Sequence, residues 1–325
     1  MKITRKDALL ESKEYSSLFE GRDIILLGYG GSYAYGTNIE GSDIDIRGIY
    51  MNPEDEVLGI RPDSEQYVAE DTDTVIYSLR KMLKLLMSCN PNTIEILGLR
   101  EQDYLYMTDI GQMILDRKDI FLSRKAEHTF GAYAKSQLNR LMNKSGRAND
   151  HLEENEARSV EKVLENFWDR YKAYGTVNAY PKDGDVLFDI DVHGMPIEKT
   201  GKLLNEINAV ERDYKRSVRN DKAIEHNKLN KHMMHLIRLY MMGIDIMGGE
   251  IRTYRDGADH ELLMSIRNGD YLEGDMKTPT PAFGELVHDY EKRFDEACRQ
   301  SQLPEEPDIE QINDLSKDIC RKAFG

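Results

Sequence analysis

Residues 28–50 read GYGGSYAYGTNIEGSDIDIRGIY, and this stretch decides the fold of the N-terminal part of the chain. The apolar run 23–29 that leads into it predicts a buried strand, which ends at a glycine-rich turn. Residues 42–50 then alternate polar and apolar side chains, a period of two that predicts a half-buried second strand. The stretch therefore reads as a strand, a tight turn and a second strand.

Two familiar phosphate-binding loops are each excluded by a single position. The dinucleotide pattern GxGxxG, begun at Gly28, has Tyr33 where its third glycine is required. The P-loop pattern, begun at Gly31, has Thr37 in place of its lysine. The glycines of this stretch therefore serve another kind of site.

The turn and the second strand carry complementary polar groups. Gly30 and Gly31 allow a tight turn and a close approach to a ligand, and Ser32 adds a hydroxyl at the start of a short helix, where backbone N–H groups suit phosphates. About ten residues later, Asp43 and Asp45 point to the same face of the expected strand. Neighbouring carboxylates repel unless a cation lies between them, and their hard oxygens suit Mg²⁺. A phosphate cradle beside such a pair predicts phosphoryl or nucleotidyl transfer.

The stretch resembles the signature of the DNA polymerase beta-like nucleotidyltransferases, in which Gly-Gly-Ser precedes an Asp-x-Asp strand. The wider wording, from Gly31 to Gly48, is similar to one branch, the bacterial and phage predicted nucleotidyltransferases. Four further segments are similar to that branch: 77–81, 90–97, 231–238 and 266–269. The resemblance implies a nucleoside triphosphate donor, with ATP as the default, and release of pyrophosphate. It also implies Mg²⁺ or Mn²⁺ on Asp43 and Asp45.

The resemblance implies a third carboxylate on a neighbouring strand, which ligates metal and helps to deprotonate the attacking hydroxyl. Asp73, at the start of an expected strand 73–79, is the first candidate. The alternatives are Glu70, Asp71 and Glu95. Arg47 follows on the face of the aspartates, where it contacts substrate or holds the carboxylates in place.

A second constellation lies on a predicted helix, 222–247. Lys231, His235 and Arg238 are spaced i, i+4, i+7 and share one helical face. The resemblance implies that such cations, from a helical second domain, contact the phosphates or the acceptor; the alternative is a solvated helix face. Further candidates for this role are His232, Lys135 and Arg140.

The pattern as a whole predicts an α+β (α/β) fold with a small mixed sheet flanked by helices. We expect a catalytic domain over residues 1–120 and a mainly helical domain over 121–325 that closes the cleft. A strand pair is expected around 186–190. The expected helices cover 1–20, 80–89, 93–97, 111–117, 125–144, 152–173, 198–219 and 222–247.

The composition of the chain favours some cellular compartments and binding partners over others. Three widely spaced cysteines among 325 residues fit neither a disulfide framework nor a zinc site, which favours a reduced, cytoplasmic compartment. No apolar run is long enough for a membrane span or a secretory signal. A net charge of −15 argues against extended nucleic-acid binding. The acceptor class stays open among an RNA end, a protein and a small molecule.

Two rival functions use the same residues. The first is a catalytically idle nucleotide-binding regulator in a defence or toxin–antitoxin system, against which the intact Asp43 and Asp45 weigh. The second is a nuclease or phosphohydrolase, which also uses acidic pairs and metal. The regulator would bind a triphosphate without releasing pyrophosphate. The nuclease or phosphohydrolase would cleave its substrate without transferring a nucleotidyl group.

Overall fold

The computed structural model describes residues 15–60, 64–69, 72–148, 171, 173–182, 185–205, 229–274 and 278–325. Glu70 and Asp71 lie outside these ranges. Four predicted helices lie wholly or partly outside them: 1–20, 152–173, 198–219 and 222–247. The described parts of the last two are helical, at 197–205 and from 229 onward.

A mixed five-stranded sheet, in the order β3-β4-β2-β1-β5, confirms the predicted small sheet. Its strands are β1 (Asp23–Tyr29), β2 (Ile46–Met51), β3 (Gln66–Ala69), β4 (Thr74–Ser78) and β5 (Tyr104–Met107). Strand β2 runs parallel to β4, and the other three pairings are antiparallel. The short edge strands β3 and β5 were not predicted, because four residues carry too little periodicity to be recognised.

Apolar burial explains why the central strands form. Ile24, Leu27, Ile46 and Ile76 each expose at most 2% of their surface and share one core cluster. Full burial of such a side chain stabilises the fold by roughly 1.5–3 kcal/mol. This run of buried residues holds the centre of the sheet fixed, and with it the turn and lead-in segments at its end.

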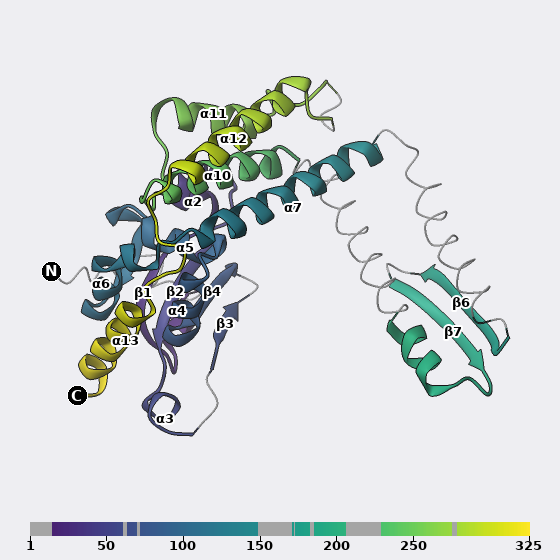
Figure 1. The fold of residues 1–325 in the computed structure, drawn as a ribbon, viewed down its shortest axis with the longest axis horizontal. Coiled ribbons are helices and arrows are strands. Elements are labelled where there is room, and N and C mark those ends of the chain that lie inside the picture. Colours follow the sequence, from purple (N-terminus) through teal and green to yellow (C-terminus); the bar gives the residue numbers. More distant parts are fainter. Residues whose placement is uncertain are drawn as a thin grey trace. The chain divides into compact units, whose positions relative to one another are not determined.

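Helices cover the sheet in the first part of the chain. Helix α4 (Leu79–Met87) contacts β2 and β4, and α6 (Asp109–Asp116) contacts β1 and β5. The C-terminal helix α13 (Ile309–Phe324) lies beside α6, far from it in sequence (Figure 1). The remaining helices are α2 (Gly31–Tyr35), α3 (Glu54–Val57), α5 (Pro91–Ile94), α7 (Lys125–Ala148), α10 (Leu229–Met247), α11 (Gly257–Asn268) and α12 (Pro281–Gln300). Short 3-10 helices occupy Ser16–Phe19, Glu95–Gly98, Glu101–Asp103 and Lys118–Phe121.

Capping residues in the sequence explain where several of these helices begin. Helix α4 begins after Ser78, whose hydroxyl accepts a hydrogen bond from the Lys81 backbone N–H. Helix α5 begins after Asn90, which caps it, with Pro91 at its first position, as the sequence predicts. The expected continuation over 93–97 becomes the 3-10 turn Glu95–Gly98. Helices α11, α12 and α13 were not predicted one by one.

The strand expected over 42–50 begins later, at Ile46, so that prediction was wrong for the aspartates themselves. Strand β1 pairs with β2 only as far as Tyr29 opposite Ile46, and then turns into α2. On the other side, β4 begins at Thr74, also opposite Ile46. Residues 42–45 therefore have no partner strand, and Asp43 and Asp45 lie in the segment that leads into β2.

The chain divides into two compact units. The first comprises Met1–Gln137, Met234–Asp270 and Ala282–Gly325, and it contains the sheet. The second comprises Leu138–Met233 and Tyr271–Pro281, and it contains the antiparallel pair β6 (Gly175–Lys182) and β7 (Asp185–Val192), which confirms the predicted strand pair. The domain boundary at residue 120 stays a prediction. Within the described ranges, no helix combines the length and apolarity needed to cross a membrane.

Candidate active site

The glycine-rich turn packs directly against Asp45. The Gly30 backbone N–H donates a 2.8 Å hydrogen bond to the Asp45 carbonyl. A Cβ atom at Gly31 would overlap the Asp45 carboxylate, and Gly31 has a φ of +53°, which favours glycine. The absence of a side chain here therefore lets the start of α2 touch a candidate metal ligand. Asp43 is exposed, and Asp45 is partly buried.

Arg47 links Asp45 to Asp73. Its Nη2 lies 3.4 Å from Asp45 Oδ1, and its Nη1 donates to the Asp73 carbonyl at 2.5 Å. Asp73 directly precedes Thr74, and Asp45 directly precedes Ile46. Thr74 and Ile46 are paired with each other in the parallel ladder of β2 and β4. The backbone of Asp73 therefore lies next to that of Asp45, and its own side chain is exposed. This arrangement favours Arg47 as the residue that holds the two acidic segments together.

A buried polar cluster lies behind the turn. The Tyr35 hydroxyl donates to Glu95 Oε2 at 3.1 Å, and the guanidinium of Arg238 lies 3.7 Å from the centre of the Tyr35 ring. Burial raises the pKa of the Glu95 carboxyl above its ordinary range, against the opposing effects of Arg238 and Arg47. Burial likewise raises the pKa of Tyr35, which keeps this hydroxyl protonated as a donor. Glu95 thus has a position suited to supporting Tyr35 and Arg238.

The cationic residues that were predicted to share one face of α10 lie in two different environments. Arg238 is buried, with 8% exposure, and its Nη1 lies 3.4 Å from the Gly31 carbonyl. His235 Nδ1 lies 3.0 Å from Arg238 Nη2, and the His235 ring meets Tyr133 edge-on. Lys231 is exposed and belongs to the second unit. The structure therefore brings Arg238 to the glycine-rich turn, with His235 in contact with Arg238.

The other cationic candidates are Lys135, His232 and Arg140. Lys135 is exposed on α7, and His232 is half-buried on α10. The side chain of Arg140 lies outside the described residues.

Two residues of α11 that were not predicted as site residues hold the segment between the turn and the aspartates, although one of them, Arg267, lies in the family-like segment 266–269. His260 Nε2 donates to the Gly36 carbonyl at 2.9 Å, and Arg267 Nη2 donates to Ser42 Oγ at 3.1 Å. Arg267 shares the buried face of α11 with Leu263 and Ile266. A charged residue at helical spacing among core positions is a signal that could have selected it.

The donor set fits a divalent ion bound in part by substrate. Asp43 and Asp45 supply hard oxygen ligands, and Asp45 lies against the turn proposed to hold phosphates. Mg²⁺ commonly uses one or two carboxylates together with substrate phosphates. No group of three acidic, histidine or cysteine side chains converges on a metal position within the described ranges. The carboxylate pair therefore suits an ion that is completed by a nucleotide.

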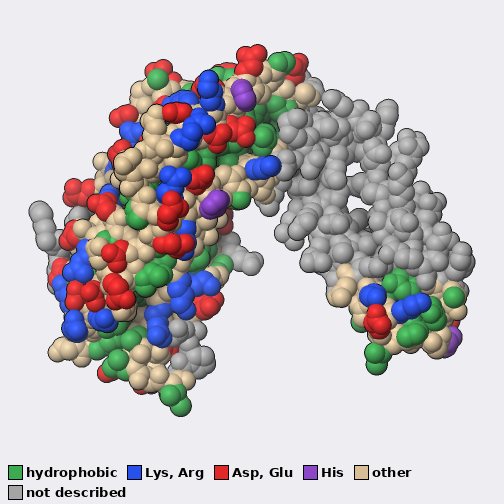
Figure 2. All heavy atoms as spheres, viewed as in Figure 1, with side chains coloured by type: hydrophobic (Ala, Val, Ile, Leu, Met, Phe, Trp, Pro, Cys, Tyr) green, Lys and Arg blue, Asp and Glu red, His purple; other side chains and the backbone are tan. Residues whose placement is uncertain are grey.

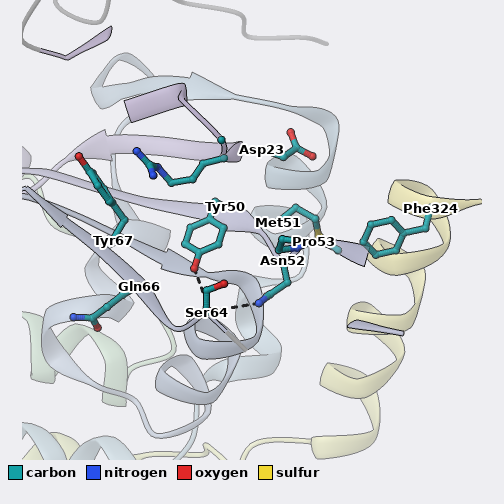
Figure 3. Close-up of a pocket in the computed structure, with 11 residues that line it drawn as sticks. Asp23, Tyr50, Met51, Asn52, Pro53, Ser64, Gln66, Tyr67 and Phe324 are labelled. Atoms are coloured by element: carbon teal, nitrogen blue, oxygen red, sulfur yellow. Dashed lines mark hydrogen bonds between the residues drawn. The ribbon is translucent and has the colours of Figure 1, made fainter. Parts of the chain in front are cut away.

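A separate cavity of about 460 Å³ lies at the opposite end of β2 (Figure 3). Its lining includes Tyr50, Asn52, Ser64 and, from α13, Phe324. The Tyr50 hydroxyl and the Asn52 amide both donate to the Ser64 carbonyl, at 3.1 Å and 3.5 Å. A six-residue strand is roughly 20 Å long, so this cavity is distinct from the aspartate site.

One of three comparisons with known proteins found a match. No curated protein and no solved structure matched the chain significantly. One family model, described as the RNA repair pathway DNA polymerase beta family, matches residues 1–318. Because that match covers nearly the whole sequence, the chain belongs to the RNA repair pathway DNA polymerase beta family, whose type of activity is nucleotidyl transfer.

Proposed function

We propose that the chain transfers a nucleoside monophosphate from a nucleoside triphosphate, with ATP as the default donor, to an acceptor. The contact between Gly31 and the Asp45 carboxylate carries this proposal. It joins a turn suited to phosphates to an acidic pair suited to a divalent ion. Catalysis of this kind depends on positioning and on neutralising charge, which these groups can supply.

The proposed reaction breaks one bond and forms one. An acceptor oxygen attacks the α-phosphorus, the bond to the bridging α–β oxygen breaks, and pyrophosphate leaves with that electron pair. Asp73 would accept the proton of an attacking hydroxyl. Asp43 and Asp45 would hold Mg²⁺ or Mn²⁺, with Asp73 as a third ligand; a bound ion of this kind supplies neutralisation of phosphate charge.

The remaining side chains would bind and orient the donor. Gly30, Gly31 and Ser32 would face its phosphates, and Arg47 would fix the Asp45 carboxylate at its observed 3.4 Å. Arg238 is supported as a phosphate contact by its position at the Gly31 carbonyl, and His235 by its contact with Arg238. Lys231 is proposed as a phosphate contact from the helical spacing alone.

The acceptor proposed first is the end of an RNA strand. The family description names an RNA repair pathway, and that class was one of three left open by the sequence. On the face drawn in Figure 2, Lys and Arg side chains are interspersed with Asp and Glu side chains. Mixed charge of this kind suits a short strand end better than a long polyanion, whose binding rests on many neutralised phosphates.

The test uses α-labelled nucleoside triphosphates with Mg²⁺ or Mn²⁺ and oligoribonucleotides that end in hydroxyl or phosphate groups. We expect the α-label to appear on the RNA, and Asp43→Asn or Asp45→Asn to reduce its rate by about 10²-fold or more. The matched control is Asp289→Asn, an exposed carboxylate on α12. Transfer of γ-label, RNA cleavage, or tight nucleotide binding with no pyrophosphate release would each overturn the proposal.

A further inference from the structure

Two arginines from different helices are buried, one at the glycine-rich turn and the other at the segment that leads to the aspartates. Arg238 of α10 and Arg267 of α11 each expose only 8% of their surface. Removing a guanidinium from water is costly unless hydrogen bonds and opposite charge replace the lost hydration. Packing alone therefore does not explain why these two guanidinium groups are buried.

The contacts of Arg238 leave one of its guanidinium donors without a hydrogen bond among the described residues. It meets the Gly31 carbonyl at 3.4 Å, His235 Nδ1 at 3.0 Å and the face of Tyr35 at 3.7 Å. None of these groups is a carboxylate. Across the described part of the chain, its buried Nε has no hydrogen-bond partner, and the guanidinium makes no ion pair. An unsatisfied buried donor of this kind costs about 1–3 kcal/mol, and a bound anion would recover that energy.

Arg267 brings a second positive charge to the segment that leads to the aspartates. Its Nη2 donates to Ser42 Oγ, one residue before Asp43. The pKa of Arg267 is lowered, first by burial and then by repulsion from Arg238, so the two charges are close enough to interact. An anion bound between them would relieve that repulsion. Glu95 also interacts electrostatically with Arg238, and it accepts a hydrogen bond from the Tyr35 hydroxyl.

We propose that Arg267 is a further phosphate-binding residue, which together with Arg238 holds the polyphosphate chain of the donor between α2 and the Ser42–Asp43 segment. This inference rests on the proposed function and deepens it by adding a helix, α11, to the substrate site. Arg238 approaches the phosphates from the Gly31 side, and Arg267 from the side of the metal-binding pair. Planar guanidinium groups suit this role because each presents paired donors to phosphate oxygens.

The first measurement is the binding of inorganic tripolyphosphate to the full chain without metal, by titration calorimetry. We expect Arg267→Gln and Arg238→Gln each to raise Kd by about tenfold or more, because each loses a charge-assisted contact. The matched control is Arg299→Gln, a largely exposed arginine on α12, which we expect to leave Kd unchanged. An Arg267→Gln variant that folds and binds tripolyphosphate like the unchanged protein would overturn the inference.

A second variant guards against misfolding and against a purely structural role. Arg267→Lys keeps the charge but loses the paired donors, so we expect a Kd between those of the unchanged protein and Arg267→Gln. Tripolyphosphate should also slow hydrogen exchange in residues 36–43 of the unchanged protein, a readout that needs no variant. Equal exchange with and without tripolyphosphate would count against the site.

Further arms separate this inference from the proposed function and from another source of phosphate. If tripolyphosphate binding depends on Arg267 but no α-label is ever transferred, the inference stands and nucleotidyl transfer fails. If transfer occurs with an unchanged KM for the triphosphate in Arg267→Gln, the inference fails and the function stands. If Arg267→Gln weakens binding of a 5′-phosphorylated dinucleotide but not of tripolyphosphate, the assignment to the donor is overturned.

Discussion

Gly31 lies so close to the Asp45 carboxylate that a side-chain carbon at position 31 would be 2.8 Å from Asp45 Cγ and would overlap its oxygen. The positive φ of Gly31, +53°, brings the start of α2 down onto the segment that precedes β2. Two parts of the motif that are separated in sequence are thereby in contact. Both the fold and the proposed chemistry therefore require a residue without a side chain at position 31.

We predict that Gly31→Ala will destabilise the protein by about 2–4 kcal/mol, through a strained φ and a collision with Asp45. Gly41→Ala is the matched control, since Gly41 has a φ of +79° but no heavy atom within 4 Å of the place that a Cβ would occupy. It should lose only about 1 kcal/mol. Urea unfolding measures both, and equal losses would show that the collision with Asp45 is relieved at no cost.

We predict that Asp73 and Glu95 differ in their effects on the rate. Asp73→Asn should lower kcat by about 10²-fold or more with little change in KM, because it removes a proposed proton acceptor. Glu95→Gln should lower kcat less than tenfold, because Glu95 hydrogen bonds to Tyr35 and would act through it and Arg238. Single-turnover kinetics with α-labelled ATP distinguishes the two, and the reverse order would make Glu95 the third carboxylate.

We predict that His260→Ala will loosen residues 36–42. The His260 side chain donates to the Gly36 carbonyl at 2.9 Å, and this bond ties the segment to α11. Hydrogen exchange in 36–42 should become faster, with a loss of global stability of about 1 kcal/mol. His288→Ala, an exposed histidine of α12, serves as the control. Unchanged exchange in His260→Ala would mean that the segment is held by its other contacts alone.

We predict that Cys298 makes stability fall between pH 9 and pH 11. Burial, with smaller contributions from Glu127 and Asp295, raises the pKa of this thiol from 9.0 to about 11. Above pH 9 the unfolded thiol ionises while the folded thiol keeps its proton, so alkali favours unfolding until about pH 11. The stability advantage of the unchanged protein over Cys298→Ala should therefore shrink across this range in urea titrations. A constant difference would place the folded pKa near 9.0.

Strong local signals in the sequence determined the central part of the sheet and the motif, although not the edge strands β3 and β5. The apolar run of β1, the Asn90-Pro91 cap and the strand pair β6–β7 were each predictable, because burial period and capping chemistry act over a few residues. The Asp-x-Asp pattern and the glycine turn likewise identified the family to which the chain belongs. The start of β2 was not predictable, because it depends on where the pairing of β2 with β1 and β4 begins.

Only the tertiary structure decided which distant side chains meet. The sequence marked Arg238 by its helical spacing, but it gave no sign that Arg267 and His260 would reach the segment 36–42 from α11. Those contacts join residues more than two hundred positions apart. Periodicity and capping report on neighbours in the chain, whereas the long-range approach of helices depends on how the whole core packs. The sequence thus named the acidic pair and its turn, and the packing of α10 and α11 decided which arginines lie beside them.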